Sequence, residues 1–147
     1  GTTFQDNMDL NLFYDKESRK FSEHGYIGLY KDKSIRAVGK LKKTIIAVEV
    51  EGKMTYRAES GEAPTPDEIC RINEAIRRAE DYGYNLRTIS HRYFMVEKFY
   101  PIDFRKSSKN PIQKSKFFNL ADMFGYKTMP DTEKIAADLN GRTWEEF

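Results

Sequence analysis

The stretch from Gly25 to Glu59 constrains the fold most, because it contains four short apolar runs joined by links too short to hold a helix. One link is Lys31–Lys33, and another is Glu51–Gly52, a two-residue link of the kind that hairpins use. Links of this length join antiparallel neighbours, whereas parallel strands need a long crossover. The runs are rich in Tyr, Ile and Val, which favour strands. They are Tyr26–Tyr30, Ile35–Lys40, Thr44–Val50 and Met54–Ala58. The sequence therefore predicts an antiparallel meander of four strands.

A helix with clear start and stop signals is predicted after the meander, over Pro66–Tyr82. Thr65 can cap its first turn, and Glu68 can return a hydrogen bond to the Thr65 amide, which together make a capping box. Pro66 suits the first helical position, where no backbone N–H is needed, and Gly83 is a natural stop. One face of this helix is apolar at helical spacing. Its residues are Ile69, Ile72, Ile76 and Ala79.

The flanking segments complete the predicted organisation. Residues 1–24 are interpreted as a lead-in that is extended or forms a short helix, residues 25–126 as the main domain, and residues 127–147 as a helical tail packed on it. Pro101 is expected to end the strand that precedes it, and Trp144 and Phe147 are expected to dock the end of the chain. The elements predicted in this part are strands at Arg92–Phe99 and Phe117–Leu120 and a helix at Asp131–Leu139.

This element order predicts an α+β fold: a small antiparallel, barrel-like sheet with one long helix and a short C-terminal helix. Over residues 25–120 the order resembles OB-type barrels, in which a helix sits between the third and fourth principal strands. It also resembles PUA-like barrels such as the EVE and ASCH modules, which read nucleic acid. The resemblance lies in element order, and it implies a barrel whose rim binds nucleic acid.

Composition excludes several classes of protein. The chain has 147 residues, enough for one domain, and its 14% aromatic content is typical of a folded protein rather than a disordered one. Its longest apolar stretches are about four residues, so no transmembrane helix and no membrane partner are expected. A single cysteine, Cys70, excludes an internal disulfide and favours a reducing, cytoplasmic location. No glycine-rich phosphate loop and no serine elbow is present in the sequence. A non-catalytic protein is therefore favoured over an enzyme, and neither a cofactor nor a resident metal is expected.

Charge is distributed unevenly although the net charge is only +2. Residues 103–116 contain five basic residues and one acidic residue, whereas residues 131–147 contain five acidic and two basic residues. A positive loop followed by a negative tail is a patterned surface. In the predicted fold the positive loop connects the last two strands, a position that OB folds use to bind oligonucleotides.

The basic loop is therefore the candidate site for a nucleic acid or a nucleotide. Cations attract phosphates, hydroxyl groups add hydrogen bonds, and aromatic rings offer stacking surfaces for bases. A solvated loop whose rings belong to the core is the alternative interpretation. The candidate binding residues are Arg105, Lys106, Ser107, Lys109, Lys114, Lys116, Tyr100, Phe104 and Phe117.

A metal-dependent nuclease is a second hypothesis. Glu51-Gly52-Lys53 follows an apolar run in the acid-x-Lys pattern of restriction-type nucleases, with Asp32 as an earlier acid. Carboxylates suit Mg²⁺, and a lysine can stabilise developing charge. The same residues lie where hairpins are expected to turn, so turn formation is the competing explanation.

A protein-interaction domain is a third hypothesis. The positive loop of one copy could meet the negative tail of another and so drive self-association. Because the chain starts at Gly1, a domain excised from a larger parent protein is also considered.

Overall fold

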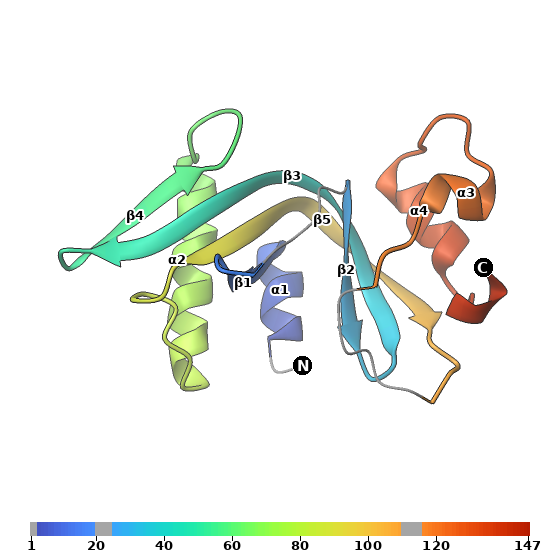
Figure 1. Ribbon diagram of the computed structural model, residues 1–147, viewed down its shortest axis with the longest axis horizontal. Coiled ribbons are helices and arrows are strands. Elements are labelled where there is room, and N and C mark those ends of the chain that lie inside the picture. Colours follow the sequence, from blue (N-terminus) through green and yellow to red (C-terminus); the bar gives the residue numbers. More distant parts are fainter. Residues whose placement is uncertain (1–2, 20–24, 110–115) are drawn as a thin grey trace. The chain divides into compact units, whose positions relative to one another are not determined.

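A computed structural model describes residues 3–19, 25–109 and 116–147. They form an α+β structure in which five strands make one antiparallel sheet (Figure 1). The strands are β1 (Leu12–Lys16), β2 (Tyr26–Lys31), β3 (Ser34–Val50), β4 (Lys53–Ala58) and β5 (His91–Arg105). The helices are α1 (Phe4–Leu10), α2 (Pro66–Asp81), α3 (Leu120–Phe124) and α4 (Thr132–Leu139), with a 3₁₀ turn, η1 (Trp144–Glu146).

The strand order is β1-β5-β3-β2, and β4 pairs with another part of β3. In the β1–β5 pair Leu12 lies opposite Met95, and in the β3–β4 pair Ile45 lies opposite Ala58. The predicted neighbours β2, β3 and β4 are thus confirmed as consecutive antiparallel strands. Among the described strands the sheet is open, with β1 at one edge, and does not close into a barrel.

Local signals account for the confirmed helices. In α2 the Thr65 hydroxyl accepts the Glu68 N–H, and the Glu68 carboxylate accepts the Thr65 N–H, so the predicted capping box is present. In α4 the carboxylate of Asp131 caps the first turn by accepting the Lys134 N–H. Each cap satisfies backbone donors that the first turn of a helix leaves without partners.

The predicted break between Ile35–Lys40 and Thr44–Val50 is wrong, because both runs belong to β3. Residues 40–44 contain no glycine, proline or asparagine to turn the chain. The predicted end of a strand at Pro101 is also wrong, since β5 continues through it to Arg105. Proline removes one backbone donor, but its φ is compatible with an extended strand.

The predicted strand at Phe117–Leu120 is wrong as well. Residues 116–119 are irregular, and Leu120 begins α3. The side chain of Asn119 accepts the N–H of Asp122 and thereby caps this short helix. Within residues 116–147 no strand element follows β5, so the predicted connection between two last strands is not found among the described residues.

The described residues form two compact units, and β2, β3 and β5 each contribute a part to both. Unit 1 comprises the described parts of Gly1–Ile27 and Gly39–Phe99. Unit 2 comprises Gly28–Val38 and the described parts of Tyr100–Phe147. The domain limits predicted after residues 24 and 126 remain a prediction. No helix within the described ranges has the length and apolar character needed to cross a bilayer.

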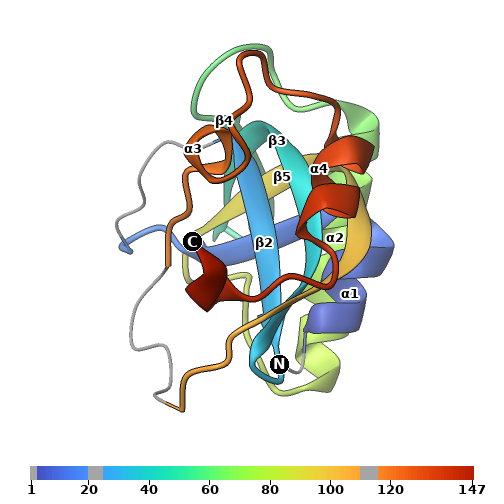
Figure 2. The ribbon, with the colours of Figure 1, turned by 90° about the vertical axis from the view of Figure 1, so that its right-hand side faces the viewer.

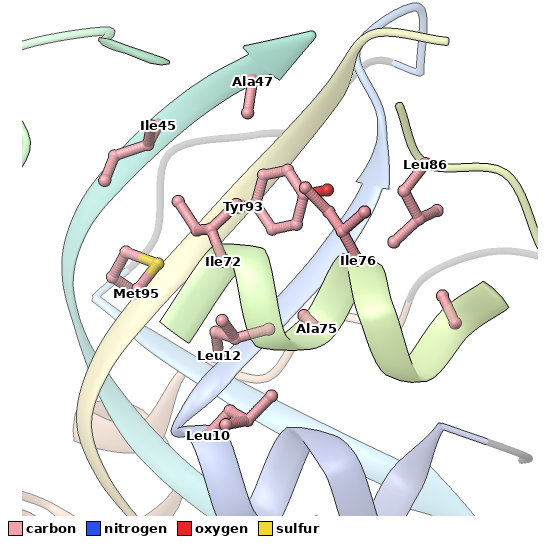
Figure 3. Close-up of a cluster of buried hydrophobic side chains, with 11 residues drawn as sticks. Leu10, Leu12, Ile45, Ala47, Ile72, Ala75, Ile76, Leu86, Tyr93 and Met95 are labelled. Carbon is pink, nitrogen blue, oxygen red and sulfur yellow. The ribbon is translucent and has the colours of Figure 1, made fainter. Parts of the chain in front are cut away.

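The core of unit 1 lies between the sheet and the helices α1 and α2 (Figure 3). Ile72 and Ile76 from α2 pack with Leu12 of β1 and Ile45 of β3, all of them inaccessible to solvent. Tyr93 of β5 lies among them with its ring fully buried, and desolvation raises the pKa of its hydroxyl. This apolar layer stabilises the unit through the burial of apolar surface.

Candidate functional site

The end of β5 and the C-terminal segment lie side by side in unit 2 (Figure 2). Arg105 forms a parallel β-bridge with Thr143, and its N–H donates to the carbonyl of Arg142 at 3.1 Å. The indole Nε1 of Trp144 donates to the carbonyl of Phe104 at 2.9 Å, in a buried position. These contacts hold the C-terminal turn η1 against the segment that carries the predicted basic loop.

A cluster of aromatic rings forms the base of the site. The rings of Phe104 and Phe118 meet edge to face with centroids 5.2 Å apart, and Phe118 makes a similar contact with Trp144 at 5.2 Å. Phe104 is only 1% exposed, whereas Phe117 is 57% exposed. Edge-to-face contacts of this kind stabilise a ring cluster beyond its burial alone. The Phe104 ring therefore serves the core, whereas the ring of Phe117, the chain neighbour of Phe118, is exposed.

Beside these rings is a cavity of about 620 Å³, which we call the aromatic cavity. This volume falls within the roughly 300–1,000 Å³ that is typical of small-molecule sites. The lining residues come from the segment after β5, from residues 116–123 and from η1. They are Lys106, Ser108, Lys116, Phe117, Phe118, Asn119, Asp122, Met123, Trp144, Glu145 and Phe147.

Two successive backbone amides at the cavity hold a carboxylate. The N–H groups of Ser107 and Ser108, which we call the amide pair, both donate to Glu145, at 3.1 Å and 2.9 Å. Hydrogen bonds from the Ser107 hydroxyl and from the amide pair lower the pKa of Glu145 to about 2. Successive backbone N–H groups that converge on one acceptor are a common anion-binding arrangement. The acidic tail and the basic segment thus meet within a single chain.

The cavity is lined by charges of both signs. Nζ of Lys116 lies 5.5 Å from the centroid of the Phe118 ring, and Nζ of Lys106 donates to the carbonyl of Ser108 at 2.9 Å. Glu145 and Asp122 supply two carboxylates. The formal charges of these four lining side chains therefore balance.

The predicted nucleic-acid-binding residues are only partly brought together. Four of them line the cavity or bind its carboxylate: Lys106, Ser107, Lys116 and Phe117. Of the others, Tyr100, Phe104, Arg105 and Lys109 lie outside this set.

These remaining residues occupy different environments. Phe104 is buried, and Arg105 is half-exposed with its guanidinium 3.4 Å from the carboxylate of Asp103. Tyr100 is partly buried in β5, and Lys109 is exposed. Lys114 lies outside the described residues.

Sequence reasoning missed Glu145 and Asp122 as neighbours of the basic segment. Asn119 with Asp122 three residues later is a capping pattern that could have indicated a helix instead of a strand. No local signal links Glu145 to Ser108, because the two residues are 37 positions apart.

The residues of the nuclease hypothesis occupy two turns. Asp32 lies between β2 and β3 with a φ of 52°, and Glu51 lies between β3 and β4 with a φ of 51°. Lys53 pairs with Val50 at the start of β4. These turns stand at the two ends of β3, a strand of 17 residues. Within the described ranges, no group of three or more His, Cys, Asp or Glu side chains is placed to hold a metal ion.

Comparison with protein-family models, with curated proteins and with solved structures gave no significant match for this chain.

Proposed function

We propose that this protein binds a nucleotide or a single strand of nucleic acid in the aromatic cavity without catalysing a reaction. The observation that carries the proposal is that two lysines, Lys106 and Lys116, and the exposed ring of Phe117 line the same cavity. Lysines neutralise phosphates, and a solvent-exposed ring can stack on any base. The ligand is thus recognised mainly by its backbone charge and by stacking, with little dependence on sequence.

The OB-like or PUA-like assignment belongs to the same proposal. It is supported by the consecutive antiparallel strands β2, β3 and β4, which are followed by α2. OB folds are partly open barrels that bind oligonucleotides and oligosaccharides. The assignment adds a reason to test nucleic acid before other anions.

Binding is tested with a fluorescently labelled oligothymidylate of about ten nucleotides, a length within the site sizes typical of single-strand binding domains. Anisotropy is recorded over a series of salt concentrations. We expect the affinity to fall as salt rises, because bound lysines release counterions from the strand. Absence of salt-dependent binding by the wild-type protein would overturn the proposal.

Three variants and one matched control locate the site. Lys106→Gln and Lys116→Gln should each lower the slope of log affinity against log salt by about 0.7. Phe117→Ala should cost about 1–3 kcal/mol of binding free energy through lost stacking. Lys127→Gln removes the same charge from an exposed lysine of unit 2 that does not line the cavity. If this control weakens binding as much as Lys116→Gln does, binding is not localised at the cavity.

A further inference from the structure

Glu145 accepts hydrogen bonds from two successive backbone amides beside the aromatic cavity. Its carboxylate accepts both members of the amide pair, and it belongs to the lining of the cavity together with Lys106 and Lys116. A carboxylate and a phosphate group both present anionic oxygens to such donors. The position of Glu145 therefore marks where an anionic group binds.

We propose that Glu145 is an internal competitor that occupies the amide pair in the ligand-free protein, and that a phosphate group of the ligand replaces it on binding. This inference rests on the proposed function, because it concerns the same cavity. The side chain of Glu145 is carried by η1, a turn of three residues close to the C-terminus, and is exposed. Release of this side chain does not require the core of unit 2 to open.

The charges of the lining residues support this exchange. With Glu145 in place, two lysines and two carboxylates face the cavity, and an incoming phosphate gains little net attraction. When Glu145 leaves the amide pair, Lys106, Lys116 and two backbone donors face the ligand with one nearby carboxylate, that of Asp122. A phosphate then meets a positive site with oriented donors.

The size of the effect follows from the share of molecules in which the amide pair is open. If the amide pair is open in about one tenth of the molecules, the apparent affinity is about tenfold weaker than the intrinsic affinity. Glutamine at position 145 is a weaker competitor, because its neutral amide oxygen accepts the two N–H groups less strongly than a carboxylate does, and this weakening recovers the tenfold loss of affinity. We therefore expect Glu145→Gln to bind the ligand about tenfold more tightly than the wild-type protein.

The experiment compares Glu145→Gln with Asp122→Asn, which removes the same charge from the same cavity without touching the amide pair. Labelled oligothymidylate and, as a phosphate source without bases, inorganic pyrophosphate serve as probes. We expect Glu145→Gln to gain about tenfold for both probes. Asp122→Asn should gain only the general electrostatic contribution, less than about threefold at physiological salt.

A measurement on the wild-type protein needs no substitution. When oligothymidylate saturates the protein, the carboxyl ¹³C resonance of Glu145 and the amide resonances of Ser107 and Ser108 should all move. If the Glu145 resonance stays unchanged in the complex, the carboxylate remains on the amide pair. The proposal that a phosphate group replaces it is then wrong.

The outcomes separate the inference from the proposed function. If the wild-type protein and Glu145→Gln both fail to bind either probe, the proposed function is wrong. If the wild-type protein binds and Glu145→Gln gains no more than Asp122→Asn does, the proposed function stands and the internal competitor is overturned.

Discussion

Nζ of Lys43 lies 2.8 Å from Oε1 of Glu68, and both side chains are almost buried. The same carboxylate oxygen accepts the backbone N–H of Thr65 at 2.8 Å, so one residue closes the capping box of α2 and pairs with β3. Desolvation acts to raise the pKa of Glu68, but hydrogen bonds from Lys43 and from the Thr65 amide lower its pKa overall. This carboxylate therefore connects the start of the helix to the sheet within unit 1.

Glu68→Gln should lower the free energy of unfolding by about 1–3 kcal/mol at neutral pH, because glutamine can still accept the Thr65 N–H but leaves the almost buried Lys43 ammonium without its carboxylate. Because the folded pKa of Glu68 lies below its unfolded value, its contribution is complete above the ordinary value near 4.5 and is lost as pH falls through the folded value. The difference between variant and wild type in urea unfolding should shrink from pH 7 to pH 3. Glu62→Gln, in an exposed loop, is the matched control and should change little. If the difference in unfolding free energy between Glu68→Gln and the wild type does not change with pH, the role assigned to the Glu68 carboxylate is wrong.

Gly39 permits a close approach of two strands in unit 1. A Cβ at this position would lie 2.9 Å from Cδ1 of Phe99 and 3.1 Å from the carbonyl oxygen of Lys98. Gly39→Ala should cost about 1–3 kcal/mol of stability, because neither a buried ring nor a backbone carbonyl can yield easily. Gly25→Ala is the control, since a Cβ there meets nothing within 4 Å. If Gly39→Ala and Gly25→Ala unfold at the same temperature, the close approach of the two strands does not restrict the side chain at position 39.

Asn11 joins the end of α1 to β5 beyond the last β1–β5 pair. Its backbone φ is 51°, its Oδ1 accepts the N–H of Phe99 at 3.0 Å, and its carbonyl accepts the N–H of Val96 at 3.1 Å. Asn11→Ala should cost about 2–3 kcal/mol, because it loses the side-chain hydrogen bond and places alanine in the left-handed region. Asn11→Gly loses the hydrogen bond but accepts this backbone conformation, so it should cost less. Chemical denaturation that ranks the glycine variant as the less stable one would contradict this explanation.

Trp144 anchors the C-terminal turn in unit 2 through its indole hydrogen bond to Phe104. Trp144→Phe keeps an aromatic ring but removes the donor and some buried volume, so it should cost about 1–3 kcal/mol. Far-UV circular dichroism during urea unfolding measures the change. Phe117→Leu, at an exposed ring of the same unit, should have a much smaller effect. Equal losses in the two variants would show that the indole anchor contributes little.

Helix caps and tight turns depend on residues that are close in the chain, and the sequence was sufficient to predict the elements that begin or end at them. The capping box at Thr65 and Glu68 lies within one turn, and it places the start of α2 correctly. The two-residue link Glu51–Gly52 forms the turn between β3 and β4, with both residues at positive φ.

Predictions failed where the outcome depended on distant partners. Hydrogen bonds from Val96 and Phe99 to Asn11 support β5 beyond the reach of β1, and the N–H of Lys106 donates to the carbonyl of Lys33 just after β5 ends. Pro101 gives no local information about such partners, and its φ fits a strand that the sheet extends.

Local patterns were enough to predict the α+β class, the antiparallel order of the central strands and the helix α2, because turn and cap chemistry depends on neighbouring residues. Long-range packing brings the basic segment against the acidic tail of the same chain. Packing also buries Phe104 and leaves Phe117 exposed. The hydrogen bonds from Ser107 and Ser108 to Glu145 span 38 and 37 positions, and their formation depends on how β5 and η1 pack, which no local pattern encodes.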